Sequence, residues 1–373
     1  MDYEFSSEEL GVIDDTGRVV RETLSAAPPL ERLDPGGMRD LERQLAFNLG
    51  PTGYTEYGLS AGKPFGAAAM AAMSGFAANT PPLFIMFEMG MRVFGRLVAG
   101  YGNAGQKQAF LDPLVKGEIT AAVAVCEKTM NIVNDPLETK GERDGETVRV
   151  SGEKGFVVSG LFADVIAVAG RLDDGIGVFL IDREMPGVKF ATVELADDYR
   201  HLCPCKMVLD DCVVPADRVI GPVGGHALLS SLRLWEDQVL VAAAVGMMDA
   251  ALFEATLHAK SHRSGGKPVI AYQEVGFKLA EMHMLSETSR LMAYKAGWLD
   301  SKQDREGAVF TDCAKVFCAE SAGEVAGGAL RVLSLKGFEP GSLACSAYKW
   351  SKYVQVSGTS TEIARMRIGD DAL

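Results

Sequence analysis

Two stretches of the chain hold residues whose types and spacing suggest chemistry. Glu88 interrupts a long apolar run, and a lone buried carboxylate is costly unless it is paired or functional. Glu88 is therefore a candidate acid or base, and an ion pair with Arg92, four residues on, is the structural alternative. Near the C-terminus, residues 358–361 read Gly-Thr-Ser-Thr. Such a turn favours an anionic or carbonyl-bearing ligand at the start of the next helix, with plain capping by the hydroxyls as the alternative.

The segment after this turn predicts a C-terminal helix with two different faces. Three apolar residues recur at helical spacing and are expected to face a core: Ile363, Met366 and Ile368. Three charged residues among them are expected to face water: Glu362, Arg365 and Arg367.

Composition excludes several classes of function. The 373 residues are 47% hydrophobic and 23% charged, as in an ordinary globular protein, and a net charge of −13 argues against nucleic-acid binding. No run of about 18 apolar residues predicts a membrane span, and the acidic start lacks a signal-peptide pattern. Seven cysteines without repeat spacing favour a reducing, cytoplasmic location. Cys203 and Cys205 have no companion pair or histidine cluster, so we predict buried thiols and no metal site.

Helical patterns occupy both ends of the chain. Residues 1–117 carry apolar side chains at three- and four-residue spacing, which predicts an N-terminal helical domain. Residues 226–373 hold three long apolar-striped segments and the terminal helix, and these predict a C-terminal four-helix bundle. One such stripe comprises Val275, Leu279, Met282 and Leu285.

The middle of the chain has the pattern of short strands. Residues 118–225 are rich in Val, Ile and Phe, with no intervening helical periodicity. Asp-Gly pairs at 144–145 and 174–175 predict hairpin turns. We therefore expect a central antiparallel β-barrel domain, and the fold class is α+β.

This order of helices, β-domain and helical bundle resembles that of the acyl-CoA dehydrogenase superfamily. The stretches that resemble the family span nearly the whole chain: GQKQAFLDPLVKGE, GEKGFVVSGLFADVIAVAGR, VVPADRVIG, KLAEMHMLSETSRLMAYKAGWLDS and GTSTEIARMRI. The resemblance implies FAD as cofactor and an acyl-CoA thioester as substrate. It also implies a carboxylate that removes the C2 proton while a hydride leaves C3 for the flavin, and an electron-transfer flavoprotein as electron acceptor.

The family's catalytic carboxylate has two possible places in this sequence. The common place, directly before the terminal Gly-Thr, holds Ser357, or Gly358 if one residue is inserted. A group resembling isovaleryl- and long-chain enzymes carries the carboxylate on the first bundle helix, and the stretch LRLWEDQVLVAAAVG supplies Glu236 there. Glu236 is thus the candidate base, with a plain first-turn glutamate as the alternative. The family's next residue, an arginine, is Asp237 in this chain, and a second carboxylate there would raise the pKa of the base.

The resemblance also carries over a set of cofactor contacts. They are Cys126, Phe156, Val158, Arg263, Gln273, Gly337 and Thr359. Several depart from the family pattern. Cys126-Glu127-Lys128 stands for Thr-Glu-Pro, residues 131–133 replace Gly-Ser-Asp, and residues 331–335 replace the Gln-x-x-Gly-Gly that cradles the partner's cofactor.

Three functions stay open on the sequence alone. The first is an FAD-dependent acyl-CoA dehydrogenase. The second is a non-catalytic partner subunit of a heteromeric dehydrogenase, and the third is a non-redox acyl-CoA lyase or hydratase that uses Glu236 or Glu88. Apolar bundle helices predict a dimer or tetramer, of like or unlike chains. Gly90 and Gly95 indicate room for a bulky acyl chain.

Overall fold

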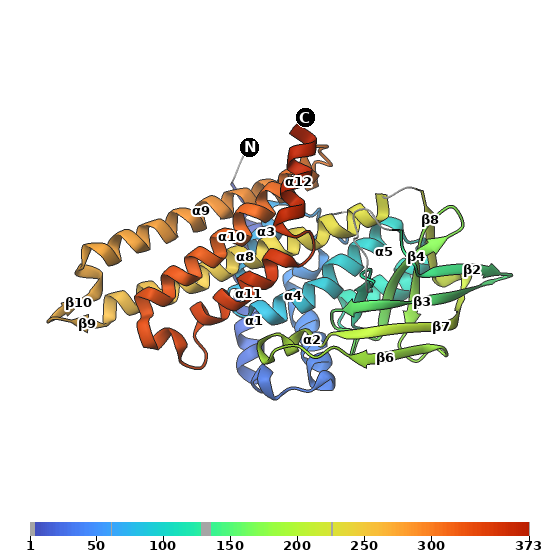
Figure 1. Ribbon diagram of the computed structural model, residues 1–373, viewed down its shortest axis with the longest axis horizontal. Helices are drawn as coiled ribbons and strands as arrows, with labels where there is room; N and C mark the ends of the chain where they lie inside the picture. Colours follow the sequence, from blue (N-terminus) through green and yellow to red (C-terminus); the bar gives the residue numbers. More distant parts are fainter. Residues whose placement is uncertain (1–3, 61, 128–135, 225–226, 373) are drawn as a thin grey trace. The chain divides into compact units, whose positions relative to one another are not determined.

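Contacts divide the protein into two compact units. The computed structural model describes residues 4–60, 62–127, 136–224 and 227–372 (Figure 1). Unit 1 comprises residues 1–20, 64–85 and 236–373, and unit 2 comprises residues 21–63 and 86–235. The predicted boundaries at residues 117 and 225 stay predictions, because this division groups residues by contact and not by composition.

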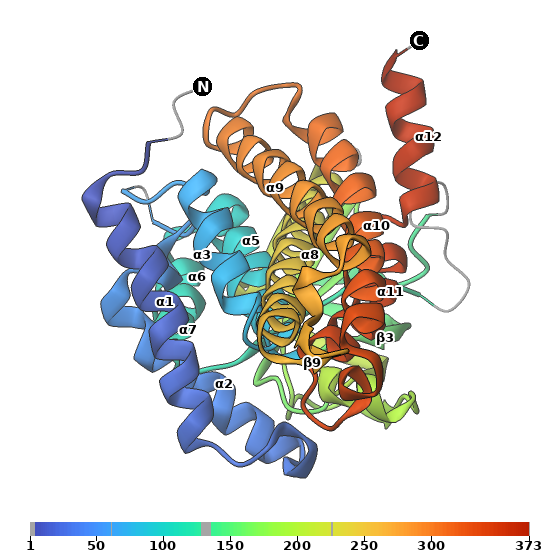
Figure 2. The same ribbon diagram turned by 90° about the vertical axis from the view of Figure 1, so that its left-hand side faces the viewer.

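Unit 1 is built from helices. Its elements are α3 (Ala67–Ala77), α9 (Gln273–Ser301), α10 (Gly307–Leu333), α11 (Leu343–Val356), α12 (Thr361–Ala372), most of α1 (Ser7–Ala26) and of α8 (Ala227–Ser261), and the short strands β9 (Arg263–Ser264) and β10 (Lys267–Pro268). Helix α10 packs against α9, α11 and α12, and α3 packs against α9 (Figure 2). The predicted helical bundle is confirmed, with α11 and α12 as separate helices at its end.

Helix α8 is long and apolar. By length and composition it is the one helix among the described residues that qualifies to cross a membrane. Of its most apolar window, 72% is buried inside the structure, which is typical of the core helix of a globular protein.

The terminal helix α12 buries a different set of residues from the predicted one. Ile363 and Ile368 are half-buried, but Met366 is 67% exposed, so its predicted place in the core is wrong. Ala364 is the buried apolar residue of this helix, together with Thr361 at its start. The helix therefore packs on the bundle through small side chains, whereas the sequence prediction considered only large apolar residues.

The helices of unit 2 are short. They are α2 (Pro35–Leu49), the end of α4 (Pro81–Glu88), the π-helical segment η4 (Met89–Phe94), α5 (Gly95–Tyr101), α6 (Ala104–Gln106) and α7 (Asp112–Val115). The apolar run around Glu88 is buried on all sides, as its composition predicts.

The strands of unit 2 form one sheet. They are β1 (Ala121–Ala124), β2 (Lys140–Asp144), β3 (Thr147–Val157), β4 (Val165–Leu172), β5 (Gly175–Asp182), β6 (Val188–Thr192), β7 (Cys205–Pro215) and β8 (Val219–Val223). The order is β6-β7-β3-β2-β4-β5-β8, with β1 beside β4. Both predicted Asp-Gly hairpins are present, β2–β3 and β4–β5, and most pairs are antiparallel. The exceptions are β1–β4 and β2–β4, which run parallel.

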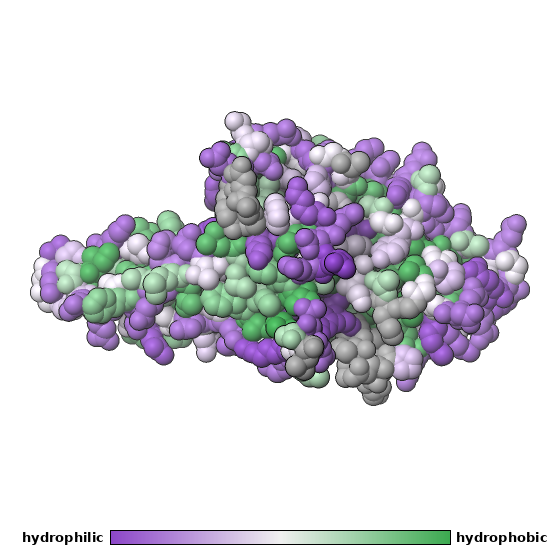
Figure 3. Space-filling model, turned by 90° about the horizontal axis from the view of Figure 1, so that it is seen from above, coloured by the Kyte–Doolittle hydropathy of each residue, from purple (hydrophilic) through white to green (hydrophobic). Residues whose placement is uncertain are grey.

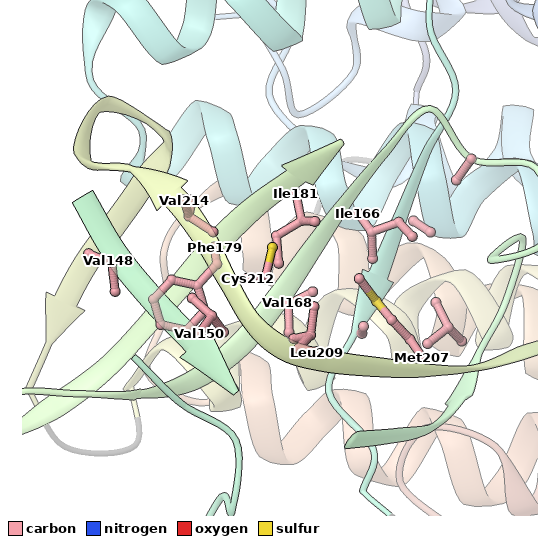
Figure 4. Packing of buried hydrophobic residues seen from close by; sticks show 14 of the residues in the cluster. Val148, Val150, Ile166, Val168, Phe179, Ile181, Met207, Leu209, Cys212 and Val214 are labelled. Carbon is pink, nitrogen blue, oxygen red and sulfur yellow. The ribbon is translucent and has the colours of Figure 1, made fainter. Parts of the chain in front are cut away.

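The core of this sheet consists of side chains that alternate along its strands. Val148 and Val150 of β3, Phe179 of β5, and Met207 and Leu209 of β7 turn toward one another in the layer that Figure 4 shows. This strand-period burial makes the sheet a rigid support for the loops at its edges.

Candidate active site

Glu236 lies on α8 beside a buried charged residue. Its side chain is half-buried, whereas the next residue, Asp237, is 2% exposed. Helical neighbours point about 100° apart around the axis, so the two carboxylates face different surroundings. The predicted second carboxylate beside the base therefore exists, but its environment decides what it does to Glu236.

Asp237 is held in a network that spans three elements. Its Oδ1 accepts a hydrogen bond from the backbone amide of Thr359 at 2.9 Å and lies 3.2 Å from Nζ of Lys315 on α10. Nζ of Lys315 also donates to the carbonyl oxygens of Ser357, at 2.6 Å, and Thr359, at 3.0 Å. The charge of Asp237 is thus balanced inside the protein, and the pair fastens the turn between α11 and α12.

That turn brings Gly358, one possible place for the family's carboxylate, beside Glu236, the other. Gly358 has a left-handed backbone (φ 63°), and a Cβ added to it would lie 3.3 Å from Cγ of Glu236 and 2.6 Å from Oδ1 of Asp237. Positions 236 and 358 are therefore direct neighbours, although 122 residues separate them along the chain. Of these two positions, 236 holds a carboxylate and 358 does not.

Lys315 was not identified from the sequence. It lies in the small, apolar stretch FTDCAKVFCAESAG and is fully buried. A lysine in such a stretch needs a carboxylate or several carbonyls as partners, because an isolated buried ammonium is too costly. This was the available signal, but nothing local in the sequence pointed to Asp237 as the partner.

Glu88 pairs with Arg92, which is the structural alternative considered for it. Nε of Arg92 lies 2.9 Å from Oε2 of Glu88, and both side chains are at most 1% exposed. The hydroxyl of Tyr54 donates to Oε1 of Glu88 at 2.6 Å, and Arg92 also donates to the carbonyls of Tyr54 and Tyr57. Both carboxylate oxygens of Glu88 are therefore engaged within unit 2.

Charge balance in this cluster follows from burial and pairing. Burial lowers the pKa of the Arg92 guanidinium, but Glu88 and Tyr54 together raise it above its ordinary value. Burial and the adjacent Glu88 carboxylate raise the pKa of Tyr54 well above its ordinary value. The cluster thus holds an ionised arginine and a protonated tyrosine, which are the states that a structural ion pair needs.

Gly90 and Gly95 leave no open space of their own. A Cβ on Gly90 would lie 2.6 Å from the carbonyl oxygen of Ala121, and one on Gly95 would lie 2.9 Å from Leu59. The prediction that these glycines leave room for a bulky acyl chain is wrong. They allow the helices of unit 2 to approach β1 and Leu59 closely.

The predicted flavin contacts of unit 2 lie close together. The carbonyl of Cys126 accepts a hydrogen bond from the amide of Gly155 at 2.9 Å, so Cys126 lies beside the end of β3. Val157, the last residue of β3, is fully buried in the sheet core, whereas Phe156 before it and Val158 after the strand are half-exposed. An apolar, half-exposed surface of this kind fits the flat ring of a flavin.

Below that surface, a buried ion pair fixes the loop after β1. Nζ of Lys154 lies 2.7 Å from Glu127 and donates to the carbonyl of Val125. Burial opposes ionisation of Glu127, but hydrogen bonds from Lys154 and Thr139 lower its pKa overall. The replaced residues Lys128 and 131–133 lie outside the described part of the chain.

Two predicted contacts of unit 1 are exposed and polar. Arg263 lies in the β9–β10 hairpin, where its guanidinium donates to the carbonyl of Gly266 at 2.6 Å. Gln273 is the first residue of α9, and the preceding Tyr272 makes no side-chain capping bond to the helix. A guanidinium and an uncapped helix N-terminus fit an anionic diphosphate.

The other two predicted contacts of unit 1 have structural roles. A Cβ on Gly337 would lie 2.9 Å from Leu330 and 3.1 Å from Leu333, so tight packing requires glycine there. Thr359 is 2% exposed, and its amide and carbonyl are bound to Asp237 and Lys315. Capping of α12 falls to Ser360, whose hydroxyl accepts from the amide of Ile363 at 3.4 Å.

The cysteines show no sign of metal chemistry. Within the described residues, no group of three or more His, Cys, Asp or Glu side chains is arranged to hold a metal ion. Cys203 and Cys205 are free and buried, and burial raises the pKa of their thiols to about 12 and about 11. They behave as small apolar residues of the sheet.

Sequence comparison identifies the relatives of this chain. Residues 230–373 match the family model described as acyl-CoA dehydrogenase, C-terminal domain. The chain is 30% identical over 283 residues to an isovaleryl-CoA dehydrogenase, mitochondrial, from Oryza sativa subsp. japonica, covering 72% of this chain and 67% of that protein.

Solved structures agree over the whole chain. Butyryl-CoA dehydrogenase from Megasphaera elsdenii superposes with a TM-score of 0.89 at 21% identity, covering 100% of both chains. A structure described as the electron transferring flavoprotein of Acidaminococcus fermentans superposes with a TM-score of 0.88 at 20% identity, again covering 100% of both chains. At such identities these structures establish the fold. Together with the 30% identical relative, they lead to one conclusion: the chain belongs to the acyl-CoA dehydrogenase family.

Proposed function

We propose that this protein removes hydrogen from C2 and C3 of an acyl-CoA thioester, with Glu236 as the base. The observation that carries the proposal is the contact between Gly358 and Glu236, because Gly358, the place for the family's carboxylate if one residue is inserted, lies beside the only carboxylate of the two positions. Similarity to an isovaleryl-CoA dehydrogenase supports the same assignment.

Glu236 takes the C2 proton in this reaction. A thioester carbonyl acidifies the neighbouring C–H, and a carboxylate held against it and shielded from water is a sufficiently strong base. The C2–H bond breaks, its proton goes to the carboxylate oxygen, and its electron pair forms the new C2–C3 double bond as a hydride leaves C3. Half-burial of Glu236 suits this role better than full exposure.

FAD is the proposed hydride acceptor. When bound, it supplies the two-electron oxidant that the reaction needs. In unit 2, Phe156 and Val158 offer an apolar surface that fits its flat ring, and in unit 1 the exposed Arg263 and the N-terminus of α9 offer groups that fit a diphosphate. Cys126, at the end of β1, would lie at the edge of the ring.

The proposed partners are an electron-transfer flavoprotein and further copies of this chain. The superposition on the Acidaminococcus structure supports the first. For the second, large apolar side chains are exposed on α8 and α9: Phe253, Leu257, Phe277, Met284 and Leu291. Figure 3 shows hydrophobic side chains along this part of unit 1. An exposed apolar surface of this kind marks an assembly interface. Light scattering at micromolar concentration should give a dimer or tetramer, and a clean monomer would contradict this.

The function is tested with purified protein to which FAD is added. A stoichiometric flavin absorbance band and turnover of a straight, branched or cyclic acyl-CoA with an artificial electron acceptor are expected. Glu236→Gln should lower turnover about 10²–10⁴-fold, the usual contribution of a positioned base, with acyl-CoA binding retained. Glu324→Gln, which changes an exposed glutamate of α10, is the matched control and should keep parental turnover. Turnover of Glu236→Gln within a few-fold of the parent would place the base elsewhere.

A further inference from the structure

The network around Asp237 contains more than a structural ion pair requires. Asp237 and Lys315 already neutralise each other, yet Lys315 also binds two carbonyls and Asp237 binds one amide, all from residues 357–359. Every one of these bonds fastens the turn whose Gly358 lies against Glu236. A pair that only stabilised the bundle would have no need to converge on this turn.

We propose that the Asp237–Lys315 pair positions the base: it fixes the Ser357–Thr359 turn against Glu236 and cancels the negative charge that Asp237 would otherwise place beside it. The proposal rests on the proposed function of Glu236. Neither Asp237 nor Lys315 touches the substrate in this account, since both are buried, so both are positioning residues.

Other charged groups lie on the elements around the turn. On α10 and α12, Asp312 and Arg367 lie 3.6 Å apart, and Arg367 also donates to the hydroxyl of Thr359 at 3.4 Å. On α9, Asp300 accepts from Gln238. Arg233 lies one turn before Glu236 on α8 and is buried. Of the ion pairs described here, Asp237–Lys315 is bonded to the backbone on both sides of Gly358, so its removal should affect Glu236 most.

Removal of one or the other charge of the pair should change the ionisation of Glu236 in opposite directions. Lys315→Met leaves the negative charge of Asp237 uncompensated beside Glu236, which makes ionisation of Glu236 harder. Asp237→Asn leaves the positive charge of Lys315 uncompensated, which makes ionisation easier. The double variant Asp237→Asn/Lys315→Met removes both charges, so the titration of Glu236 should return near that of the parent, but kcat should stay low because the bonds to the turn are lost. Lys315→Arg keeps the charge and should leave the titration of Glu236 near that of the parent.

The test measures Glu236 itself, with and without turnover. Protein with ¹³C-labelled glutamate carboxyls is titrated by NMR, and the Glu236 signal is assigned by its loss in Glu236→Gln. The titration midpoint should move about one pH unit up in Lys315→Met and about one unit down in Asp237→Asn. The acidic limb of the pH profile of kcat should move in the same directions, with KM for the acyl-CoA little changed.

A geometric variant separates position from charge. Gly358→Ala keeps all charges, but its Cβ would lie 2.6 Å from Asp237 in a left-handed backbone, so the turn must shift. We expect kcat to fall at least about tenfold, with the acidic limb unmoved, since mispositioning of a base by about an ångström has such effects. This variant and the neutral double variant remain informative if a single-charge variant does not fold.

The outcomes distinguish a failure of the proposal for the Asp237–Lys315 pair from a failure of the proposed function. Midpoints that stay at the parental value in both single variants, or a Gly358→Ala enzyme with parental kcat, would overturn the proposal for the pair and leave the base intact. A parent that neither turns over nor exchanges the C2 proton would overturn the proposed function, whatever the midpoints do. Opposite midpoint shifts in an active parent support both.

Discussion

Two of the buried ion pairs, one in each unit of the protein, hold different kinds of segment. Glu88–Arg92 in unit 2 and Asp237–Lys315 in unit 1 are 2.9 and 3.2 Å long, and all four side chains are at most 2% exposed. In both, the cation also binds backbone carbonyls. The carbonyls in unit 2 belong to Tyr54 and Tyr57, whose side chains lie in the core.

The carbonyls in unit 1 belong to a turn that touches Glu236. A buried ion pair costs desolvation energy in either place, so burial alone does not reveal a role. The segment that the cation holds does reveal it. We therefore expect the pair in unit 2 to govern stability and the pair in unit 1 to govern the titration of the base.

The largest expected effect comes from breaking the pair in unit 2. Arg92→Met leaves Glu88 buried without its cation, and the free energy of unfolding should fall by about 3–5 kcal/mol. Denaturant unfolding measures this loss. The folded fraction should keep the parental pH profile of kcat, and Glu88→Gln/Arg92→Met should recover part of the stability. A shifted pH profile of kcat in Arg92→Met would show that both pairs affect the titration of the base.

A smaller effect is expected from the close packing behind Glu88. Gly90→Ala places a Cβ 2.6 Å from the backbone carbonyl of Ala121, and the overpacking should cost about 1–3 kcal/mol of unfolding free energy. Gly100→Ala on the following helix is the control, because a Cβ there meets nothing within 4 Å. The control should be neutral or slightly stabilising. Equal effects at both positions would show that helix propensity, and not packing, decides stability here.

Glu42 sharpens the comparison, because it is a buried carboxylate that pairs with no Lys or Arg side chain of the described residues. Burial, Asp164 and Glu88 raise its pKa well above 4.5, and its Oε2 has no hydrogen-bond partner among the described residues. The folded state therefore keeps a proton that the unfolded state loses as pH rises above 4.5, so Glu42 makes the protein less stable with rising pH up to its folded pKa.

Glu42→Gln mimics the protonated form and does not titrate. Relative to the parent, it should gain unfolding free energy as pH rises through this window, by at most about 1.4 kcal/mol per pH unit. Unfolding curves of both proteins, recorded from about pH 5 to about pH 8, measure how the difference in unfolding free energy changes with pH. A stability difference that does not depend on pH would mean that Glu42 is ionised when folded.

The smallest effect is expected from an exposed ion pair. Arg365 of α12 binds both carboxylate oxygens of Glu320 on α10 at 2.7 Å, but the side chains are 50% and 45% exposed. Arg365→Ala should change the unfolding free energy by only about 0–1 kcal/mol, since water screens the pair. A loss as large as that of Arg92→Met would show that distance, and not burial, determines the strength of these pairs.

Local patterns in the sequence predicted the elements but not their long-range partners. Apolar periodicity and the Asp-Gly pairs predicted the helical regions and both hairpins, because these signals act over a few residues. The cost of burying Glu88 pointed to a partner four residues away, which is also local. Lys315 and Asp237 are 78 residues apart, and the parallel pairing of β1 with β4 joins strands about 40 residues apart, so only the fold reveals them.

The prediction that Met366 faces the core is wrong for a related reason. A helical stripe indicates which side chains share a face, but not whether another element covers that face. In α12 the bundle contacts Ala364, and Met366 remains exposed. For the candidate site, the sequence and the family resemblance identified Glu236, whereas the network that holds the turn against it required the structure.

Exchange of the C2 proton tests the assignment of Glu236 most directly, because it reports removal of the proton from C2, the step assigned to Glu236. The FAD-loaded protein is incubated with an acyl-CoA in deuterated water, and incorporation at C2 is followed by mass spectrometry or NMR. The parent should incorporate deuterium, and Glu236→Gln should lose the exchange by about 10²–10⁴-fold while still binding the acyl-CoA. Exchange at the parental rate in Glu236→Gln would contradict the assignment of Glu236 as the base.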